Sequence, residues 1–354
     1  MADTPFAESI TRHRQRMGAS LTVMAHHYQC DEVIRHADVR GDSLELALRI
    51  RDVGSEHIAF CSVYFMAESA ALLARDDQKI YLPEPSAECS MALMSPAALL
   101  DSVLSALGES GRTIVPLAYV NSTLAVKAVV GKRGGAVCTS ANAKLMLQWA
   151  LERGDAVLFA PDKNLGQNTA DLLNLPRHER HVLKISNNGG NIDRQAADAA
   201  RLLLWPGFCS IHTRFNLRQI DRARAEHAGA VVAVHPECSP EVVAAADAVG
   251  STAFLIRYAG ELPKGATVVV GTEINLVERL AAQYAGRITV LPLVESACTH
   301  MAQTTEESLA AALDSLETDG PEASPYRVRI ADELRTPAKA ALERMIAACE
   351  AARP

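Results

Sequence analysis

The sequence lacks the features that mark membrane proteins, secreted proteins and nucleic-acid-binding proteins. No apolar run approaches the roughly 20 residues that span a bilayer, and residues 1–18 contain no apolar stretch typical of a signal peptide. Acidic and basic residues are mixed at a formal net charge of -7, and no basic block provides an electrostatic footprint for nucleic acid or an anionic membrane. We therefore expect a soluble, cytoplasmic protein whose partners are small molecules.

Motifs for nucleotides and for the common cysteine-rich metal sites are also missing. The chain has no Walker A sequence and no G-x-G-x-x-G, so nucleotide binding has little support. It has no C-x2-C pair, which excludes zinc ribbons and ferredoxin-like clusters. Without a secretory signal, the eight cysteines are expected to be reduced thiols, metal ligands or core residues.

One loop pattern occurs three times in the chain. An apolar run meets a proline and a cysteine follows within a few residues in KIYLPEPSAEC, WPGFC and ITVLPLVESAC, which end at Cys89, Cys209 and Cys298. A lone loop cysteine is more often structural than a ligand. Three cysteines in matching positions instead favour three thiolates that converge on one point.

The alternation of strands and helices predicts the fold. Units of about thirty residues with a strand followed by a helix are typical of parallel α/β architecture, and 354 residues exceed one hydrophobic core. The pattern restarts twice, which indicates an internal repeat. We predict three similar αβα sandwich domains with parallel sheets at residues 20–108 (with Cys89), 109–208 and 209–303 (with Cys298), with Cys209 at the second junction, followed by a helical tail at 304–354.

Unusual polar residues lie where the predicted strands end, which is where open parallel sheets bind ligands. These residues are His26, His27, Tyr28, Tyr119, Asn121, Ser140, His235 and Glu237. Three helix starts, at Asp42-Ser43, Thr139-Ser140 and Ser251-Thr252, offer backbone N–H groups to an anion. The same residues would cap helices without any ligand. Phosphate or carboxylate groups are the expected ligands.

Three interpretations of the cysteines and histidines remain open. Three thiolates would suit an iron-sulfur cluster in which one iron lacks a protein ligand and acts as a Lewis acid. Cys209-x2-His212 and His235-x2-Cys238 have instead the ligand types of a zinc site, although that leaves Cys89 and Cys298 unexplained. A module that only binds an anion is the third. Beside a cation, Glu237 is a candidate general base.

Together these segments resemble the quinolinate synthase family, iron-sulfur enzymes of NAD biosynthesis that condense iminoaspartate with dihydroxyacetone phosphate. The resemblance extends from Leu21 to about Leu309. Its motifs are AHHYQ, GDSLELA, FCSVYFMAESA, LPEPSAECSMA, YVNS, VCTSANA, PDKNLGQNTA, WPGFCSIHTRF, HPEC, GST, GTE and CTHMAQTT.

This resemblance implies three pseudo-symmetric domains around a [4Fe-4S] cluster held by Cys89, Cys209 and Cys298. It implies Glu237 as the principal base, with Tyr28, His26 and Tyr119 as acids or orienting groups. The substrate-binding residues it implies are His26, Tyr28, Asp42, Ser43, Tyr119, Asn121, Ser140, His212, His235, Glu237, Ser251 and Thr252. The implied partners are the two substrates and the enzyme that supplies iminoaspartate.

The chain departs from the family pattern in two places. His27 stands where members often have asparagine, so the role of this side chain is open. Some members carry two further cysteines before the last ligand, where this chain has Pro292 and Glu295. A regulatory disulfide at that place is therefore excluded.

Overall fold

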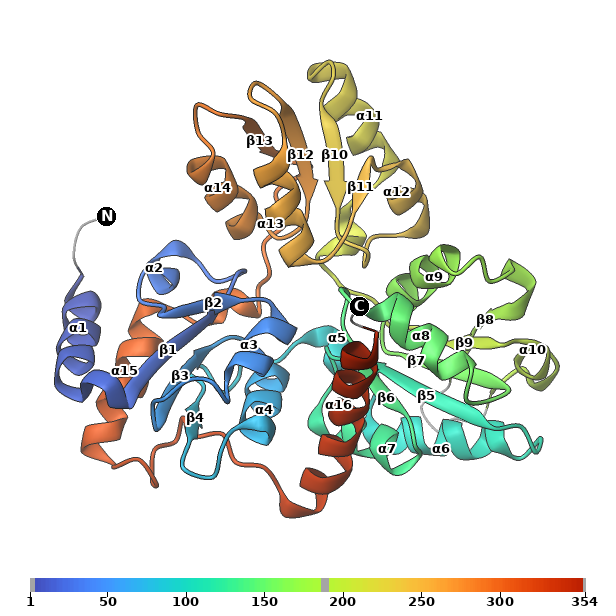
Figure 1. Cartoon of the computed structure of the whole chain (residues 1–354), viewed down its shortest axis with the longest axis horizontal. Coiled ribbons are helices and arrows are strands. Elements are labelled where there is room, and N and C mark those ends of the chain that lie inside the picture. Colours follow the sequence, from blue (N-terminus) through green and yellow to red (C-terminus); the bar gives the residue numbers. More distant parts are fainter. Residues whose placement is uncertain (1–3, 186–190, 353–354) are drawn as a thin grey trace. The chain divides into compact units, whose positions relative to one another are not determined.

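The computed structural model describes residues 4–185 and 191–352, and it consists of three parallel sheets flanked by helices (Figure 1). This confirms the predicted α/β class. The chain forms two compact units, each made of three segments. Unit 1 comprises Met1–Cys89, Glu273–Gln283 and Glu295–Ile330, and unit 2 comprises Ser90–Thr272, Tyr284–Val294 and Ala331–Pro354.

Unit 1 contains the first sheet, whose four strands pair in the order β2-β1-β3-β4. Its strands are β1 (Leu21–His26), β2 (Val39–Gly41), β3 (His57–Cys61) and β4 (Lys79–Tyr81). Its helices are α1 (Pro5–Met17), η1 (Gly18–Ser20), α2 (Asp31–Ile34), α3 (Ser43–Arg49), α4 (Tyr64–Leu73), α14 (Ile274–Gln283), η4 (Met301–Gln303) and α15 (Glu306–Thr318).

Unit 2 contains the other two sheets, with strand orders β6-β5-β7-β9-β8 and β11-β10-β12-β13. The strands are β5 (Ile114–Tyr119), β6 (Ala136–Cys138), β7 (Ala156–Ala160), β8 (Arg180–Val182), β9 (Leu202–Leu204), β10 (Val231–Val234), β11 (Ala248–Val249), β12 (Thr267–Gly271) and β13 (Thr289–Pro292). The helices are α5 (Ser90–Leu93), α6 (Ala97–Gly108), α7 (Leu124–Lys132), α8 (Ala143–Leu151), α9 (Lys163–Leu172), η2 (Arg177–Glu179), α10 (Arg194–Ala199), η3 (His212–Arg214), α11 (Leu217–Glu226), α12 (Pro240–Ala245), α13 (Thr252–Glu261) and α16 (Asp332–Ala351).

The three sheets share one topology. In each, the second strand of the repeat lies at an edge, followed by the first, the third and the fourth, and every pair is parallel. The second sheet adds β8 outside β9, so that β9 takes the fourth place. The third strands β3 and β7 are buried along their whole length and read HIAFC and AVLFA. Such continuous apolar runs are expected where helices cover both faces of a parallel sheet.

The predicted tail from residue 304 forms two helices that belong to different units. In unit 1, Leu309 and Leu313 of α15 pack against Val23 of β1 and Ala59 of β3. Burial of a leucine side chain stabilises a fold by about 1.5–3 kcal/mol, so α15 is part of the core of the first sheet.

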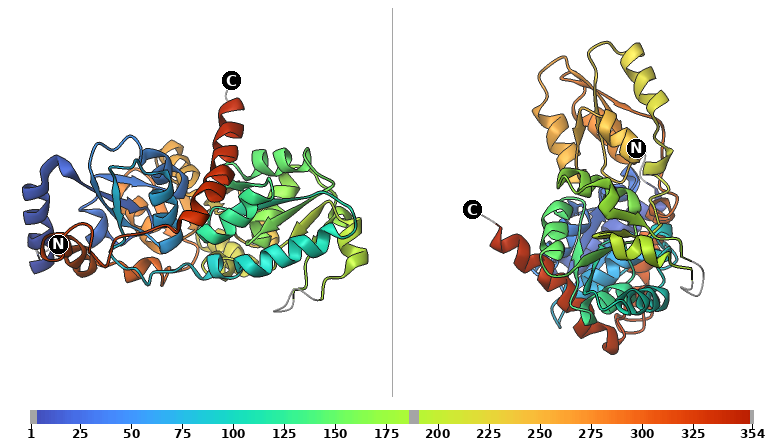
Figure 2. Two further views of the ribbon diagram at one scale, coloured as in Figure 1. Left: turned by 90° about the horizontal axis from the view of Figure 1, so that it is seen from below. Right: turned by 90° about the vertical axis from the view of Figure 1, so that its right-hand side faces the viewer.

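In unit 2, α16 packs along α7 (Figures 1 and 2). The backbones of these two helices approach closely at Gly131, where a Cβ atom would lie 1.8 Å from the carbonyl oxygen of Pro337. Arg344 of α16 also donates hydrogen bonds to the carbonyl oxygens of Gly131 and Gly135, at 3.2 and 2.6 Å. The second helix of the predicted tail is therefore fixed to the second sheet's domain.

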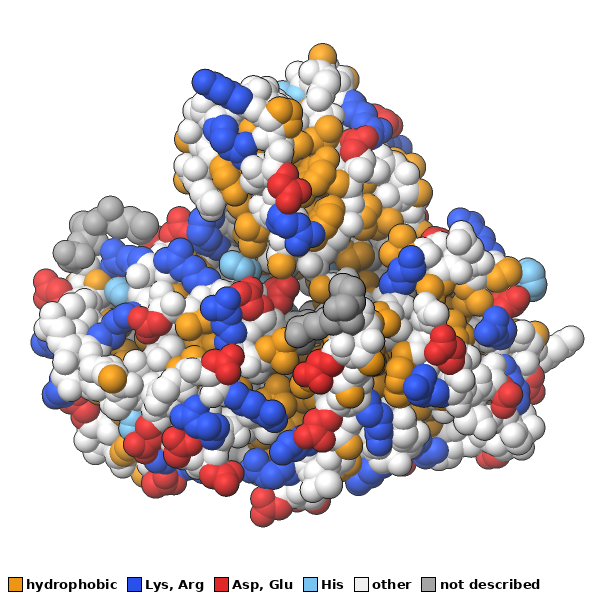
Figure 3. All heavy atoms as spheres, viewed as in Figure 1, with side chains coloured by type: hydrophobic (Ala, Val, Ile, Leu, Met, Phe, Trp, Pro, Cys, Tyr) orange, Lys and Arg blue, Asp and Glu red, His pale blue; other side chains and the backbone are white. Residues whose placement is uncertain are grey.

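Acidic and basic side chains are interspersed over the face drawn in Figure 3. Among the described residues, no helix combines the length and the apolar composition that crossing a membrane requires.

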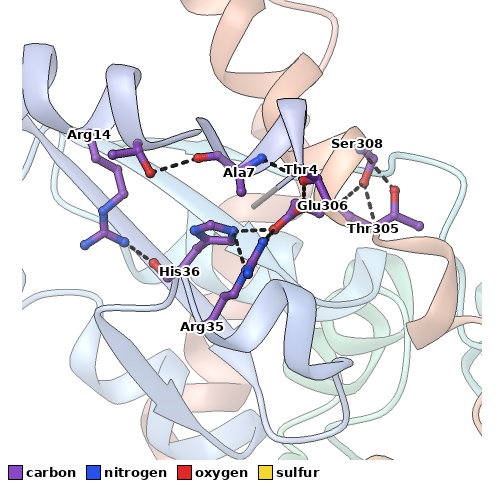
Figure 4. A network of polar contacts seen from close by, with 9 residues as sticks. Thr4, Ala7, Arg14, Arg35, His36, Thr305, Glu306 and Ser308 are labelled. Atoms are coloured by element: carbon purple, nitrogen blue, oxygen red, sulfur yellow. Dashed lines mark hydrogen bonds and ion pairs between the residues drawn. The ribbon is translucent and has the colours of Figure 1, made fainter. Parts of the chain in front are cut away.

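A buried carboxylate, Glu306, joins three helices of unit 1 (Figure 4). It accepts hydrogen bonds from Arg35 at 2.6 and 3.0 Å and contacts His36 Nε2 at 2.7 Å, at the end of α2. It also bonds the hydroxyl of Thr4, the N-cap of α1. Burial alone would raise the pKa of Glu306, but these hydrogen bonds outweigh it and lower the pKa. The network therefore favours an ionised Glu306.

We expect Glu306→Gln to lower the free energy of unfolding by about 2 kcal/mol at neutral pH, because it removes a charged partner of the partly buried Arg35. The pKa of Glu306 is lower in the folded state, so its contribution is present above the unfolded pKa of about 4.3 and is lost as pH falls through the folded value. Denaturant titrations from pH 7 to pH 3 measure this difference. Glu307→Gln is the matched control, since Glu307 lies exposed in the same helical turn.

Candidate functional site

The predicted site residues occupy equivalent positions in the three repeats. First strands end at His26 and Tyr119, and His235 directly follows β10. The predicted helix-start residues follow the second strands, as with Asp42 after β2 and Ser251 after β11. Each predicted thiolate follows a fourth strand, namely β4, β9 or β13. Because the three sheets share one topology, candidate site residues follow the first, second and fourth strands of every repeat.

The three cysteine loops are held by the same backbone hydrogen bond. In each repeat, the N–H of the first residue of the helix after the third strand donates to the carbonyl two residues before the cysteine. The bonds are Tyr64 to Ala87 (2.8 Å), Lys163 to Gly207 (3.0 Å) and Ile274 to Ser296 (3.1 Å). These N–H groups have no partner inside their helices, so the loop carbonyls satisfy them.

Burial sets three structural cysteines apart from the candidate ligands. Cys61, Cys138 and Cys238 are buried, and burial raises the pKa of all three thiols. Thiolates are the form that binds metals, so these three are poor ligand candidates. Cys89, Cys209 and Cys298 are half-buried, as are Cys30 and Cys349.

In unit 2, Glu237 lies at the centre of a buried polar cluster. Its Oε2 accepts a hydrogen bond from His212 Nδ1 at 2.7 Å, and the ring of His235 stacks on that of His212 with centroids 4.3 Å apart. The Tyr119 hydroxyl also bonds Glu237. Thr272 Oγ1 lies 3.2 Å from His212 Nε2. If His212 donates through Nδ1, its Nε2 accepts from Thr272, which fixes one tautomer of the imidazole.

Two carboxyl groups share this cluster with different protonation. Burial alone would raise the pKa of Glu237, but the neighbouring imidazoles and the Tyr119 hydroxyl lower it to about 2. Burial and the charge of Glu237 raise the pKa of Asp162 well above its usual range, while backbone N–H groups oppose the rise. Burial also lowers the pKa of His235, to about 3. The cluster therefore contains an ionised Glu237 beside a neutral His235 at neutral pH.

The loop that carries His235 and Glu237 is fixed by two amides of α9. Asn164 Nδ2 donates to the carbonyl of Glu237 at 3.3 Å, and Asn168 Nδ2 donates to Pro236 and Cys238 at 2.8 Å each. Both asparagines are buried. They belong to the motif PDKNLGQNTA, but the sequence analysis assigned them no role, because a helical asparagine alone carries no distinctive signal.

Two predicted anion-binding residues, Ser140 and Ser251, line one cavity of unit 2 of about 710 Å³. Leu165 and Phe254 supply part of its apolar lining. Two of its lining residues, Lys144 and Arg257, are cations. The helices α8 and α13 begin beside these serines and direct backbone N–H groups toward their N-terminal ends. This cavity combines apolar surface with positive charge, as an organic carboxylate requires.

In unit 1, the histidine and tyrosine after β1 contact one another. His26 Nδ1 accepts the backbone N–H of Tyr28 at 3.1 Å, and the two rings meet edge to face at 4.7 Å. Asn275 of α14 donates to the Tyr28 carbonyl at 3.1 Å, which fixes this turn. Burial lowers the pKa of His27 to about 4, so the histidine that departs from the family pattern is neutral at pH 7.

The remaining predicted residues are placed individually. Asp42 caps α3 by accepting the N–H of Glu45 at 3.0 Å, and Ser43 is the first residue of that helix. Asn121 follows β5, and its Oδ1 is buried without a protein partner. Thr252 is the first residue of α13.

The donor groups of unit 2 give the zinc interpretation little support. Among the described residues, the donor atoms of Cys209, His212 and Glu237 lie within 4.8 Å of one another. Cys238 is not in this group, and its Sγ lies 4.0 Å from the carbonyl of Gly271 in the third sheet's core. His235 is also outside this group, so the predicted Cys2His2 set would lack two of its four ligands.

The sequence analysis missed two buried acids, Asp162 and Glu273. Each follows a third strand, Asp162 after β7 and Glu273 after β12, and both are fully buried. An acid directly after an apolar strand run was the signal that could have identified them, as in LFAPD and VVVGTE.

A repeated α/β architecture with a buried carboxylate beside two stacked imidazoles and a nearby thiol defines an enzyme of acid-base chemistry with candidate metal ligands. The family model described as "Quinolinate synthetase A protein" matches residues 8–347. The quinolinate synthase of Acidobacterium capsulatum is 40% identical, over 98% of this chain and 94% of the relative. That of Corynebacterium glutamicum is 41% identical, over 99% and 89%. The chain therefore belongs to the quinolinate synthase family and is an enzyme.

The burial of the thiols predicts how they react with iodoacetamide in the metal-free native protein. Cys61, Cys138 and Cys238 should stay unmodified until the protein is denatured, because they are buried and their pKa values are raised. Cys89, Cys209 and Cys298 should react at least about tenfold faster. Mass spectrometry of peptides over time measures each rate. Rapid labelling of Cys238 in the folded protein would contradict its placement in the core.

Proposed function

We propose that the chain condenses iminoaspartate with dihydroxyacetone phosphate to quinolinate, releasing phosphate and water, as a step of NAD biosynthesis. A [4Fe-4S] cluster bound by Cys89, Cys209 and Cys298 is the cofactor of this proposal. The observation that carries it is that the three thiols occupy the same place in three repeats, each anchored by the same hydrogen bond. Family membership across nearly the whole chain supports it.

The donor chemistry fits such a cluster. None of the eight cysteines, all within the part of the chain that the structure describes, is in a disulfide, and the three candidate ligands are half-buried. When bound, a cluster with three protein ligands would offer one iron as a Lewis acid for a carboxylate or hydroxyl of the substrate. A reducing compartment such as the cytoplasm would keep these thiols available.

The acid-base steps are assigned to the cluster around Glu237. Condensation and ring closure require protons to leave carbon and nitrogen and to reach the departing water oxygens. Glu237 is ionised and would accept a proton on its carboxylate, while His212 stabilises the charge by donating Nδ1–H to Oε2. Tyr119 donates to the same carboxylate. Tyr28 and His26 are proposed as the acid or orienting groups of unit 1.

The anionic groups of the substrates are assigned to the helix starts. Ser140 and Ser251, with the N-termini of α8 and α13, would bind carboxylate or phosphate oxygens in the cavity of unit 2. Lys144 and Arg257 add positive charge there. The remaining proposed contacts are Asp42, Ser43, Asn121, His212, His235 and Thr252. The enzyme that produces iminoaspartate is a proposed partner.

The proposed ligand set predicts distinct outcomes for single cysteine variants. Cys89→Ser, Cys209→Ser and Cys298→Ser should each abolish the brown chromophore of anaerobically purified protein, because serine is a poor ligand for this cluster. Cys138→Ala and Cys349→Ala are the controls and should retain it. Absorption spectra with iron and sulfide analysis measure the result. A protein that contains zinc, or that bleaches only with Cys238→Ser, would favour the zinc alternative, and metal-free protein would favour an anion-binding module.

Glu237→Gln should reduce quinolinate formation about 10²- to 10⁴-fold while the fold and cluster remain. The substitution is nearly isosteric, but an amide does not accept a proton at neutral pH. Turnover, cluster content and substrate affinity are measured together. Glu241→Gln, at an exposed position on the following helix, is the control and should keep full activity. A near-normal rate for Glu237→Gln would remove Glu237 from the mechanism.

A further inference from the structure

The two acids that follow third strands share more than their position. Asp162 and Glu273 are both fully buried, and both stand directly before the first residue of a helix, α9 or α14. A buried acid costs free energy unless hydrogen bonds or an opposite charge stabilise it. The charge of Arg279 acts on Glu273 and helps to lower its pKa, and backbone N–H groups act on both acids.

Asp162 bonds both the helix and the cysteine loop in unit 2. Its Oδ1 accepts the N–H of Leu165 in the first turn of α9 at 2.9 Å. The backbone N–H of Cys209 also bonds this carboxyl. Asp162 forms a β-bridge with Gly207, two residues before that cysteine. The acid thus lies between the start of α9 and the candidate ligand.

Glu273 makes the corresponding contacts in unit 1. Its Oε2 accepts the N–H of Asn275 in the first turn of α14 at 2.9 Å. Its Oε1 accepts the backbone N–H of Cys298 at 3.4 Å. Asn275 Nδ2 donates to Oε1 at 3.0 Å and also to the carbonyl of Tyr28. One carboxyl therefore connects a candidate ligand to the turn that carries a proposed catalytic tyrosine.

The first repeat provides an internal comparison. There Val63 stands directly before α4, and it makes no side-chain cap. The backbone bond from Tyr64 to Ala87 is nevertheless present at 2.8 Å. The acid is therefore not needed to form this loop, and its occurrence beside Cys209 and Cys298 calls for another explanation.

We propose that Asp162 and Glu273 are positioning residues for Cys209 and Cys298, each holding the cysteine backbone N–H against the first turn of the next helix. The inference rests on the cluster of the proposed function. A cysteine N–H that donates to a carboxyl would be less available to the sulfurs of a bound cluster, and hydrogen bonds to these sulfurs are among the factors that set the reduction potential. The two acids therefore restrain two ligands and withhold two donors from the cluster.

The test uses anaerobically purified, cluster-loaded protein with Asp162→Ala or Glu273→Ala. Both variants should lose iron to a chelator about tenfold faster than the unaltered protein, which is the lower range for loss of a group that orients a metal ligand. The freed N–H groups should also favour the reduced cluster about tenfold, which corresponds to about 59 mV for a one-electron couple. Asp162→Asn and Glu273→Gln keep one acceptor oxygen and should recover most of both properties.

Two controls separate positioning from general destabilisation. Asp193→Ala removes an aspartate N-cap from α10, where Asp193 Oδ1 accepts the N–H of Ala196 at 3.1 Å. Val63→Ala alters the equivalent position of the first repeat. Both should leave the iron-loss rate and the potential unchanged.

The outcomes distinguish this inference from the proposed function. If the unaltered protein binds a cluster and forms quinolinate, but the alanine variants match Asp193→Ala in both readouts, the inference is wrong and the function stands. Variants that lose iron faster without a shift in potential, and that the amide variants do not rescue, also overturn it. If the unaltered protein binds no cluster, the proposed cofactor itself is wrong.

Discussion

The fold depends on how the loops of the parallel sheets provide hydrogen-bond acceptors for the unpaired backbone N–H groups at the helix starts. Each βα connection leaves the first turn of a helix without intrahelical partners, and the following strand's loop supplies a carbonyl. In this protein the N–H groups of Tyr64, Lys163 and Ile274 each donate this bond. In each case a cysteine lies two residues after the residue whose carbonyl accepts it. A requirement of helix geometry therefore helps to fix the position of each cysteine beyond the end of its strand. The same hydrogen bond that satisfies the start of a helix therefore also places a candidate ligand.

Burial then decides which polar groups can work at neutral pH. Glu237 stays ionised because two imidazoles and a tyrosine hydroxyl surround it, whereas Asp162 a short distance away is forced toward its neutral form. Burial raises the pKa of Glu273 to about 7, while the backbone N–H groups of Cys298, Asn275 and Leu276 oppose the rise. Three acids of similar intrinsic strength thus acquire different pKa values from their surroundings alone.

The sequence predicted the features that local patterns encode. Apolar runs identified the parallel strands, and the proline-cysteine loops identified Cys89, Cys209 and Cys298 as equivalent positions, which the strand order of the three sheets supports. Asp162 and Glu273 escaped notice because an acid beside an apolar run has no meaning until its hydrogen-bond partner is known. The sequence also did not predict that the segment from residue 304 is divided between two units. Helices α15 and α16 have similar alanine-rich compositions, and they differ in the parts of the fold against which they pack.

The place of α15 in the first sheet's core has a consequence for biosynthesis. Leu309 and Leu313 complete the packing around Val23 and Ala59, yet they lie nearly three hundred residues later in the chain. The first sheet is therefore synthesised early, but its core is completed only when α15 has been synthesised. Until then the nascent sheet carries an uncovered apolar face, and the growing polypeptide depends on chaperones or on fast synthesis to escape aggregation.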